Sequence, residues 1–141
     1  IYTYCDKILH ELIKLNQHII TCAPSILQHY IATNFDELLA ITLPQVKDIV
    51  IKRGLIAAYM DELGLKYLNG SSTFYFMVYI GNYRGSCEDF AKSLLNDCQV
   101  AVVPGIAYGK SLDRYVRVGI GSESIERIQH ALRQILKSIL E

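Results

Sequence analysis

The residues best suited to chemistry lie in the stretch Val100–Gly119, which reads VAVVPGIAYGKSLDRYVRVG. We expect a buried strand to run into Pro104-Gly105, a small loop to follow, and a second strand to carry Arg117. Strand alternation places Arg117 between an aromatic residue and a glycine on one face. Its planar guanidinium suits a carboxylate held by two parallel hydrogen bonds. Spacing alone favours the alternative, an arginine on a solvated face or paired with a neighbouring acid.

Other reactive residue types fit structural roles better than chemical ones. Lys110 follows Gly109 in a polar loop, where nothing desolvates its amine for Schiff-base chemistry. The four histidines show no metal-ligand spacing, and no G-x-S-x-G motif is present. Tyr108, in the loop facing the arginine strand, is a candidate for lining a pocket. Cys87 and Cys98 flank a predicted helix and are expected to be packing residues.

The elements that must position these residues follow from the pattern after Gly64, where the helical period ends. Strands are predicted over 66–68, 74–80, 100–103 and 115–120. Helices are predicted from a Ser86 cap to about residue 96 and from a Ser122 cap to the C-terminus. The fold class is therefore α+β, a two-layer sandwich of a small, mainly antiparallel sheet with helices on one face.

Helical patterns dominate the chain before residue 64. Helices are predicted over 3–17, 24–32 and 44–63, the last beginning at Pro44, which the first helical turn tolerates. The chain opens almost directly into a helix, and we interpret it as a piece of a longer protein. The third helix is expected to bury Val46, Ile49, Val50, Ala57, Met60 and Leu63.

Composition excludes several classes of protein. The 141 residues are 51% hydrophobic and 20% charged, which excludes a disordered chain and fits one domain or a large part of one. Lysine and arginine total 14, as do aspartate and glutamate, so no nucleic acid or membrane partner is expected. No apolar run approaches the ~20 residues of a membrane span. The four cysteines include no C-x-x-C pair and predict reduced thiols in the cytoplasm.

Several motifs together resemble a known family. The run VAVVPGIAYG followed by Tyr115-Val-Arg-Val resembles the C-terminal small domain of class I/II aminotransferases, the fold-type I pyridoxal-phosphate enzymes. The segment from Gln17 to Gln28, the pair Lys52-Arg53 and the triplet Thr73-Phe-Tyr75 resemble other parts of the family in the same order. The resemblance covers nearly the whole chain and is most specific at the Pro104-Gly105 loop and Arg117.

The resemblance implies a function. Arg117 would bind the substrate α-carboxylate, and Tyr108, Gly105 and Thr21 would line the pocket. The parent enzyme would use pyridoxal phosphate to transfer an amino group between an amino acid and a 2-oxo acid, and would form a homodimer or higher assembly. Residues 1–40 would end the large cofactor domain, and 41–141 would form the small domain, including the interdomain helix 44–63.

Two departures from the family pattern matter. None of the eight lysines has the family's cofactor-lysine context, S-x-x-K or S-K followed by G-x-R. We therefore expect this chain alone to bind no cofactor, to hold no catalytic residue and to be inactive. Tyr108 stands where phenylalanine is usual. The alternative function is a non-catalytic amino-acid-binding or dimerisation module, which a cofactor lysine in the sequence preceding Ile1 would exclude.

Overall fold

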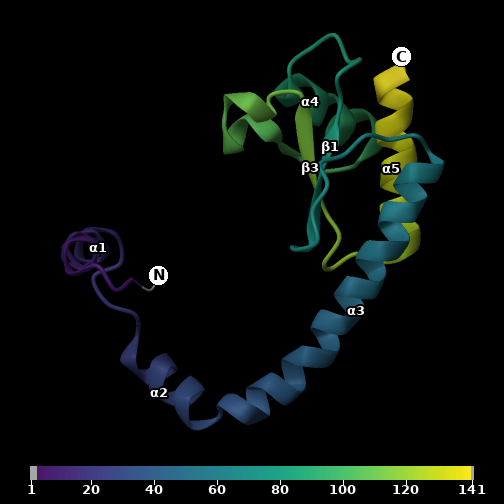
Figure 1. Ribbon diagram of the computed structural model, residues 1–141. Coiled ribbons are helices and arrows are strands. Elements are labelled where there is room, and N and C mark those ends of the chain that lie inside the picture. Colours follow the sequence, from purple (N-terminus) through teal and green to yellow (C-terminus); the bar gives the residue numbers. More distant parts are fainter. Residues whose placement is uncertain (1–2, 141) are drawn as a thin grey trace. The chain divides into compact units, whose positions relative to one another are not determined.

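The computed structural model describes residues 3–140, which form an α+β fold (Figure 1). Contacts divide the chain into two compact units, Ile1–Pro44 and Gln45–Glu141. The elements in chain order are α1 (Asp6–Ile19), α2 (Ser25–Thr33), α3 (Phe35–Glu62), β1 (Tyr75–Tyr79), α4 (Cys87–Cys98), β2 (Val103–Pro104), the 3-10 turns η1 (Gly105–Tyr108) and η2 (Lys110–Leu112), β3 (Tyr115–Gly119) and α5 (Ile125–Leu140).

The sheet of the second unit is antiparallel, with strand order β1-β3-β2. Alternate residues of β1 and β3 are buried, because one sheet face meets the helices and the other does not. This arrangement confirms the predicted α+β sandwich with a small antiparallel sheet. The core side chains from strands, α3, α4 and α5 are Ile56, Met60, Phe76, Val78, Phe90, Leu94, Val116, Val118, Ile128, Leu132 and Ile135, with smaller contributions from neighbours.

Helices α4 and α5 form from clear local signals. The Ser86 side chain accepts from the Asp89 amide at 3.1 Å, and the Asp89 carboxylate accepts from the Ser86 amide, which makes the predicted capping box. Figure 1 shows α5 beside the C-terminal half of α3, where the Arg133 guanidinium donates to the Tyr59 hydroxyl at 2.7 Å. Isoleucine and leucine at helical spacing give α5 one buried face.

Three basic side chains, those of Arg53, Lys52 and Arg114, tie the loops of the sandwich together through backbone carbonyls. Arg53 of α3 donates to the carbonyls of Gly70, Thr73 and Tyr75 at 2.8–3.4 Å. Its guanidinium also lies 4.0 Å from the ring centroid of Phe76. These contacts anchor the approach to β1.

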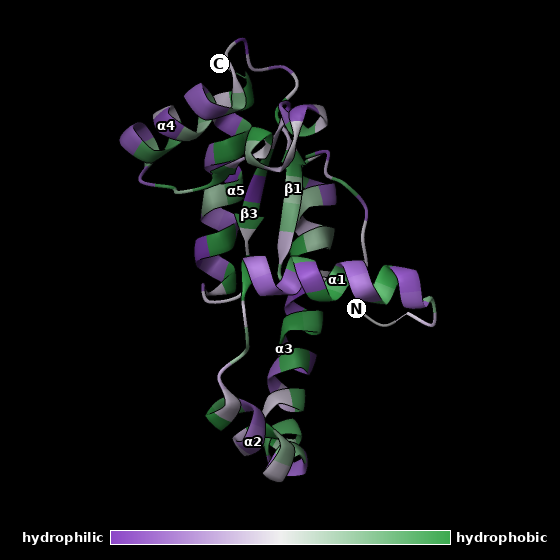
Figure 2. Cartoon of the chain, turned by 90° about the vertical axis from the view of Figure 1, so that its left-hand side faces the viewer, coloured by the Kyte–Doolittle hydropathy of each residue, from purple (hydrophilic) through white to green (hydrophobic). Residues whose placement is uncertain are grey.

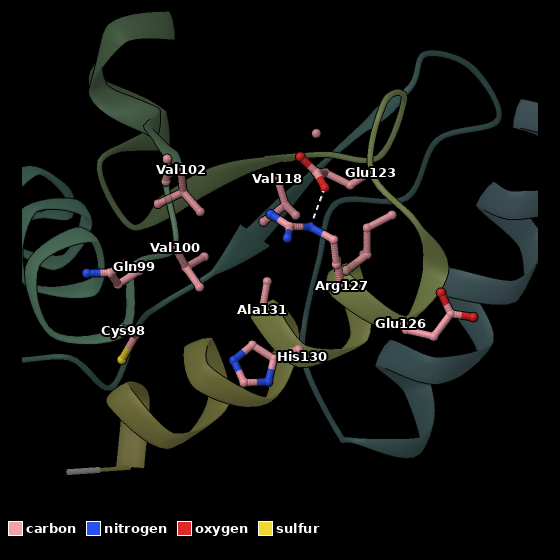
Figure 3. Close-up of a pocket in the computed structure, with 13 residues that line it drawn as sticks. Cys98, Gln99, Val100, Val102, Val118, Glu123, Glu126, Arg127, His130 and Ala131 are labelled. Carbon is pink, nitrogen blue, oxygen red and sulfur yellow. Dashed lines mark hydrogen bonds and ion pairs between the residues drawn. The ribbon is translucent and has the colours of Figure 1, made fainter.

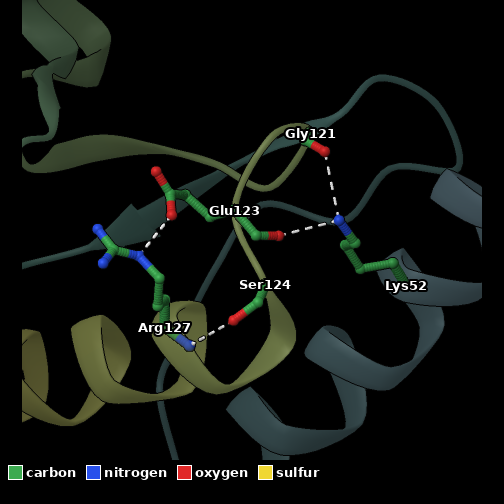
Figure 4. Close-up of polar contacts among 5 residues, drawn as sticks. All are labelled: Lys52, Gly121, Glu123, Ser124 and Arg127. Carbon is green, nitrogen blue, oxygen red and sulfur yellow. Dashed lines mark hydrogen bonds and ion pairs between the residues drawn. The ribbon is translucent and has the colours of Figure 1, made fainter.

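Lys52 anchors the link between β3 and α5 in the same way, through backbone carbonyls (Figure 4). Its ammonium donates to the carbonyls of Gly121 at 3.2 Å and Glu123 at 3.0 Å. The amide of Arg127 donates to the Ser124 hydroxyl at 3.3 Å. Ser124 therefore caps α5, and the predicted cap at Ser122 is wrong by two residues.

The N-terminal unit consists of α1, α2 and the first part of α3. Neither α1 nor α2 contains a buried residue. The colours of Figure 2 mark hydrophobic residues along both helices, and the side chains of many of them are more than half exposed. No helix within residues 3–140 has the length and apolar character needed to cross a membrane.

The third helix departs most from its prediction. It begins at Phe35 and not near Pro44, which lies inside it. Asp36 and Glu37 occupy its first turn, where carboxylates favour helix formation. Val46 and Val50 are 55% and 62% exposed, so the predicted buried face holds only in the last turns of the helix, where Met60 is buried.

The predicted strands are shorter in the structure. The strand predicted over 66–68 is a single bridge between Tyr67 and Val78. The strand predicted over 100–103 pairs with β3 only at Val103 and Pro104. The amide of Val100 donates instead to the Leu94 carbonyl of α4 at 3.3 Å, which holds this part of the chain at the helix end.

Candidate functional site

Arg117 lies in the middle of the central strand, β3. It pairs with Met77 of β1 on one side and Val103 of β2 on the other. Its neighbours Val116 and Val118 point into the core, so the half-buried Arg117 side chain lies on the sheet face away from the helices. The hydrogen-bonded strands on both sides fix its backbone, which suits a residue that must orient a ligand.

The guanidinium of Arg117 is held by aromatic rings. Its carbon lies 5.2 Å from the ring centroid of Tyr75 and 5.3 Å from that of Tyr108. Within residues 3–140, the only ion pairs are Lys14–Glu11 and Arg127–Glu123. Arg117 therefore forms no ion pair with an acid among the described residues, contrary to the alternative of an arginine paired with a neighbouring acid.

The loop between β2 and β3 brings Tyr108 to this face. It consists of the two turns η1 and η2, joined at Gly109, whose φ of 126° favours glycine. Gly105 is buried, and a Cβ atom there would clash with the backbone carbonyl oxygens of Leu112 and Tyr115. Packing alone thus requires glycine at this position, and its predicted place in a pocket stays a prediction.

Thr21 belongs to the N-terminal unit. It has a positive φ of 66° in the link between α1 and α2, and its hydroxyl donates to the Gln17 carbonyl at 3.2 Å. Arg117 belongs to the other unit, and a pocket lined by both residues stays a prediction.

Two further residues have the structural roles expected of them. Lys110 is exposed in η2, as predicted for a solvated lysine. Cys87 is buried in the core, and its thiol donates to the Asp113 carboxylate at 3.3 Å. Burial raises the pKa of the Cys87 thiol, which disfavours the reactive thiolate. No cluster of three or more metal-binding side chains occurs within residues 3–140.

A groove of about 630 Å³ lies elsewhere in the second unit (Figure 3). It opens where the 100–102 segment separates from β3, and α5 forms its other wall. Arg127, which pairs with Glu123 at 2.6 Å, and His130 line its polar side, while Val100, Val102 and Val118 line the apolar side. None of the predicted site residues lines this groove.

Comparisons with known proteins identify the family. A family profile described as aminotransferase class I and II matches residues 1–135. The chain belongs to this family. It is similar to the (5-formylfuran-3-yl)methyl phosphate transaminase of Methanocaldococcus jannaschii, at 28% identity over 92% of the chain and 34% of that protein. It is also similar to an aspartate aminotransferase of Pyrococcus abyssi, at 26% identity over 95% of the chain and 35% of that protein.

Solved structures agree with this aminotransferase assignment. The crystal structure of MJ0684 from Methanococcus jannaschii matches 94% of the chain and 35% of its own length, with a TM-score of 0.70 and 26% identity. The chain thus spans about a third of the length of the curated relatives that it matches. The resemblance of the sequence to aminotransferases is therefore confirmed in sequence and in fold.

The aminotransferase family implies pyridoxal phosphate in its complete enzymes. A cofactor lysine must be desolvated and its amine free to react. Seven of the eight lysines are exposed, and the eighth, Lys52, donates to two carbonyls. None of these eight lysines, which all lie within the described residues, is both buried and free of hydrogen bonds, so none has the environment that a cofactor lysine needs.

Sequence reasoning missed the contacts of two residues, one beside Arg117 in the fold and one close to it in the sequence. Tyr75 was noted only as part of a strand and of the Thr73–Tyr75 motif, yet its ring contacts Arg117. Arg114, three residues before Arg117, donates to the carbonyls of Gly81, Tyr83 and Gly85 at 2.6–3.0 Å. Arg114 lies in the turn just before β3, and these contacts commit its guanidinium to the loop between β1 and α4.

Proposed function

We propose that this chain supplies the substrate-binding arginine of an aminotransferase that moves an amino group between an amino acid and a 2-oxo acid. The observation that carries the proposal is the surroundings of the Arg117 side chain. It is half-buried on an open sheet face, and aromatic rings rather than acids contact its guanidinium. A charged donor fork without an anionic partner is suited to receive a carboxylate.

The role of Arg117 in this proposal is orientation. Two parallel hydrogen bonds fix a carboxylate in both position and angle, and so fix the bonds of the adjacent α-carbon. Holding the reacting carbon in one geometry lowers the entropic part of the reaction barrier. Tyr108 and Gly105 would form the loop side of the pocket, and Thr21 would approach such a site from a dimer partner.

The domain assignment belongs to the same proposal. Residues 1–40 end the large domain and residues 41–141 form the small one, with pyridoxal phosphate held by parts of the enzyme outside this chain. We place the enzyme in the cytoplasm because its four cysteines are free thiols.

The test compares two substrates that differ only in the carboxylate. In the complete enzyme, Arg117→Lys keeps the charge but loses the two parallel hydrogen bonds. We expect kcat/KM for an amino acid to fall by about 2–4 kcal/mol, because charge-assisted hydrogen bonds are worth ~1.5–3 kcal/mol each. The matching decarboxylated amine should lose far less. Equal losses on both substrates would refute the carboxylate assignment.

We also propose a homodimer or higher assembly. Groups of exposed apolar side chains on a protein surface mark interaction surfaces. Sedimentation of the chain at tens of micromolar should show a dimer or larger species, and a clean monomer would contradict the proposal. The exposed side chains that support it are Ile8, Ile19, Ile20, Ile26, Leu27 and Tyr30.

A further inference from the structure

Two tyrosines from different elements flank the same guanidinium. Tyr75 comes from β1, and Tyr108 comes from the end of η1. Both ring centroids lie within about 6 Å of the Arg117 guanidinium carbon, the range in which a cation is attracted to an aromatic face.

The register of the sheet explains how Tyr75 reaches Arg117. The residue directly opposite Arg117 on β1 is Met77, and Tyr75 is two positions along on the same face. Tyr75 is itself opposite Gly119, which has no side chain, and a Cβ there would touch nothing within 4 Å. The glycine leaves the diagonal path between Tyr75 and Arg117 open, and diagonal neighbours of this kind are within reach of aromatic side chains.

An aromatic face holds a cation differently from a hydrogen-bond acceptor. The ring attracts the positive charge without neutralising it, and the N–H groups at the edge of the guanidinium remain available for another partner. Arg53 shows the contrast, because it also lies over a ring, that of Phe76, but its N–H groups are donated to backbone carbonyls.

We propose that Tyr75 and Tyr108 are positioning residues, whose rings hold the Arg117 guanidinium in place with its N–H groups free for a carboxylate. The inference rests on the proposed function of Arg117 and adds the two residues that prepare it. Removing either ring leaves the guanidinium mobile, so carboxylate binding weakens although Arg117 itself is unchanged.

The experiment titrates the 141-residue chain with propionate, with propionamide as the neutral control. NMR follows the Arg117 side-chain Nε–H signal and the backbone amide signals of β3, and the amide signals also report binding in variants that lack Arg117. Tyr75→Leu and Tyr108→Leu should each move the Nε–H signal and weaken propionate binding about two- to five-fold, the range of an exposed cation–π contact. Phenylalanine at either position keeps the ring and should restore the binding of the unaltered chain.

Tyr79→Leu is the matched control. Tyr79 lies on the same face of β1 as Tyr75, but its ring packs on Tyr115 at 5.2 Å. This variant should bind propionate like the unaltered chain. If Tyr75→Leu fails to fold, Tyr108→Leu alone tests the inference. Tyr108 is 48% exposed and lies outside the core, so its replacement should not prevent folding.

The outcomes separate this inference from the function on which it rests. Unchanged propionate affinity in Tyr108→Leu, together with weaker binding in Arg117→Leu, would overturn the role of the rings and leave the function of Arg117 intact. Equal propionate binding by Arg117→Leu and the unaltered chain would refute the carboxylate role itself. Weaker propionate binding in Tyr75→Leu and Tyr108→Leu, with recovery in Tyr75→Phe and Tyr108→Phe, would support the inference.

Discussion

Arg114 and Arg117 are three residues apart and should respond to the same substitution in opposite ways. Methionine in place of Arg114 keeps the aliphatic stem but removes the guanidinium. That guanidinium donates to the Gly81, Tyr83 and Gly85 carbonyls, which form the loop between β1 and α4. We therefore expect Arg114→Met to destabilise the fold, whereas Arg117→Met removes no hydrogen bond to the described residues.

The magnitude follows from the contacts that are lost. Hydrogen bonds to a charged group are worth about 1.5–3 kcal/mol each, but three bonds to one group do not add fully. Arg114 is also half-buried, so water replaces part of the loss. We expect Arg114→Met to lower the free energy of unfolding by about 2–4 kcal/mol. For Arg117→Met, the loss of two cation–π contacts should cost about 1 kcal/mol or less.

The assay is urea unfolding followed by far-UV circular dichroism, since the chain contains no tryptophan. The midpoint should fall for Arg114→Met with little change in slope. Arg114→Lys should recover only part of the loss, because one ammonium cannot reach three separated carbonyls. An equal loss of stability in Arg114→Met and Arg117→Met would refute the division of roles between the two arginines.

Two further predictions concern the loop glycine and the α4 cap. Gly105→Ala should destabilise the fold by about 1–3 kcal/mol or more in urea unfolding, because its Cβ meets two backbone carbonyls, whereas Gly54→Ala should be tolerated, since a Cβ there meets nothing within 4 Å. Hydrogen bonds from Ser86 lower the pKa of Asp89 below its ordinary value of 3.8. The stabilisation by Asp89 is therefore present above that value and is lost as the pH falls through the lower folded-state pKa, so Asp89→Asn should flatten the acid limb of the stability profile. An unchanged acid limb in that variant would contradict the cap assignment.

The sequence predicted the parts of the fold that depend on local signals. The Ser86 and Asp89 pair indicated the α4 cap, and alternation around Arg117 indicated the face that it occupies. The start of α3 was misplaced because Pro44 is a strong N-terminal signal, while the weaker signal of Asp36 and Glu37 was overlooked.

The neighbours of Arg117 were not predictable in the same way. The contact with Tyr75 depends on the register between β1 and β3, which lie about 40 residues apart in the chain. The short pairing of β2 likewise depends on a hydrogen bond from Val100 to α4 that no strand pattern contains. The family resemblance singled out Arg117, but only the fold shows which rings surround it.

The carbonyl contacts of Lys52, Arg53 and Arg114 have a consequence for how the second unit responds to its solvent. Salt weakens attraction between exposed charges most strongly, and the ion pairs within residues 3–140 are exposed and local to one segment each. The loops are instead joined by cations that bind uncharged dipoles, and no acid is needed to complete these contacts. The sandwich should therefore hold its loops over a wide range of ionic strength.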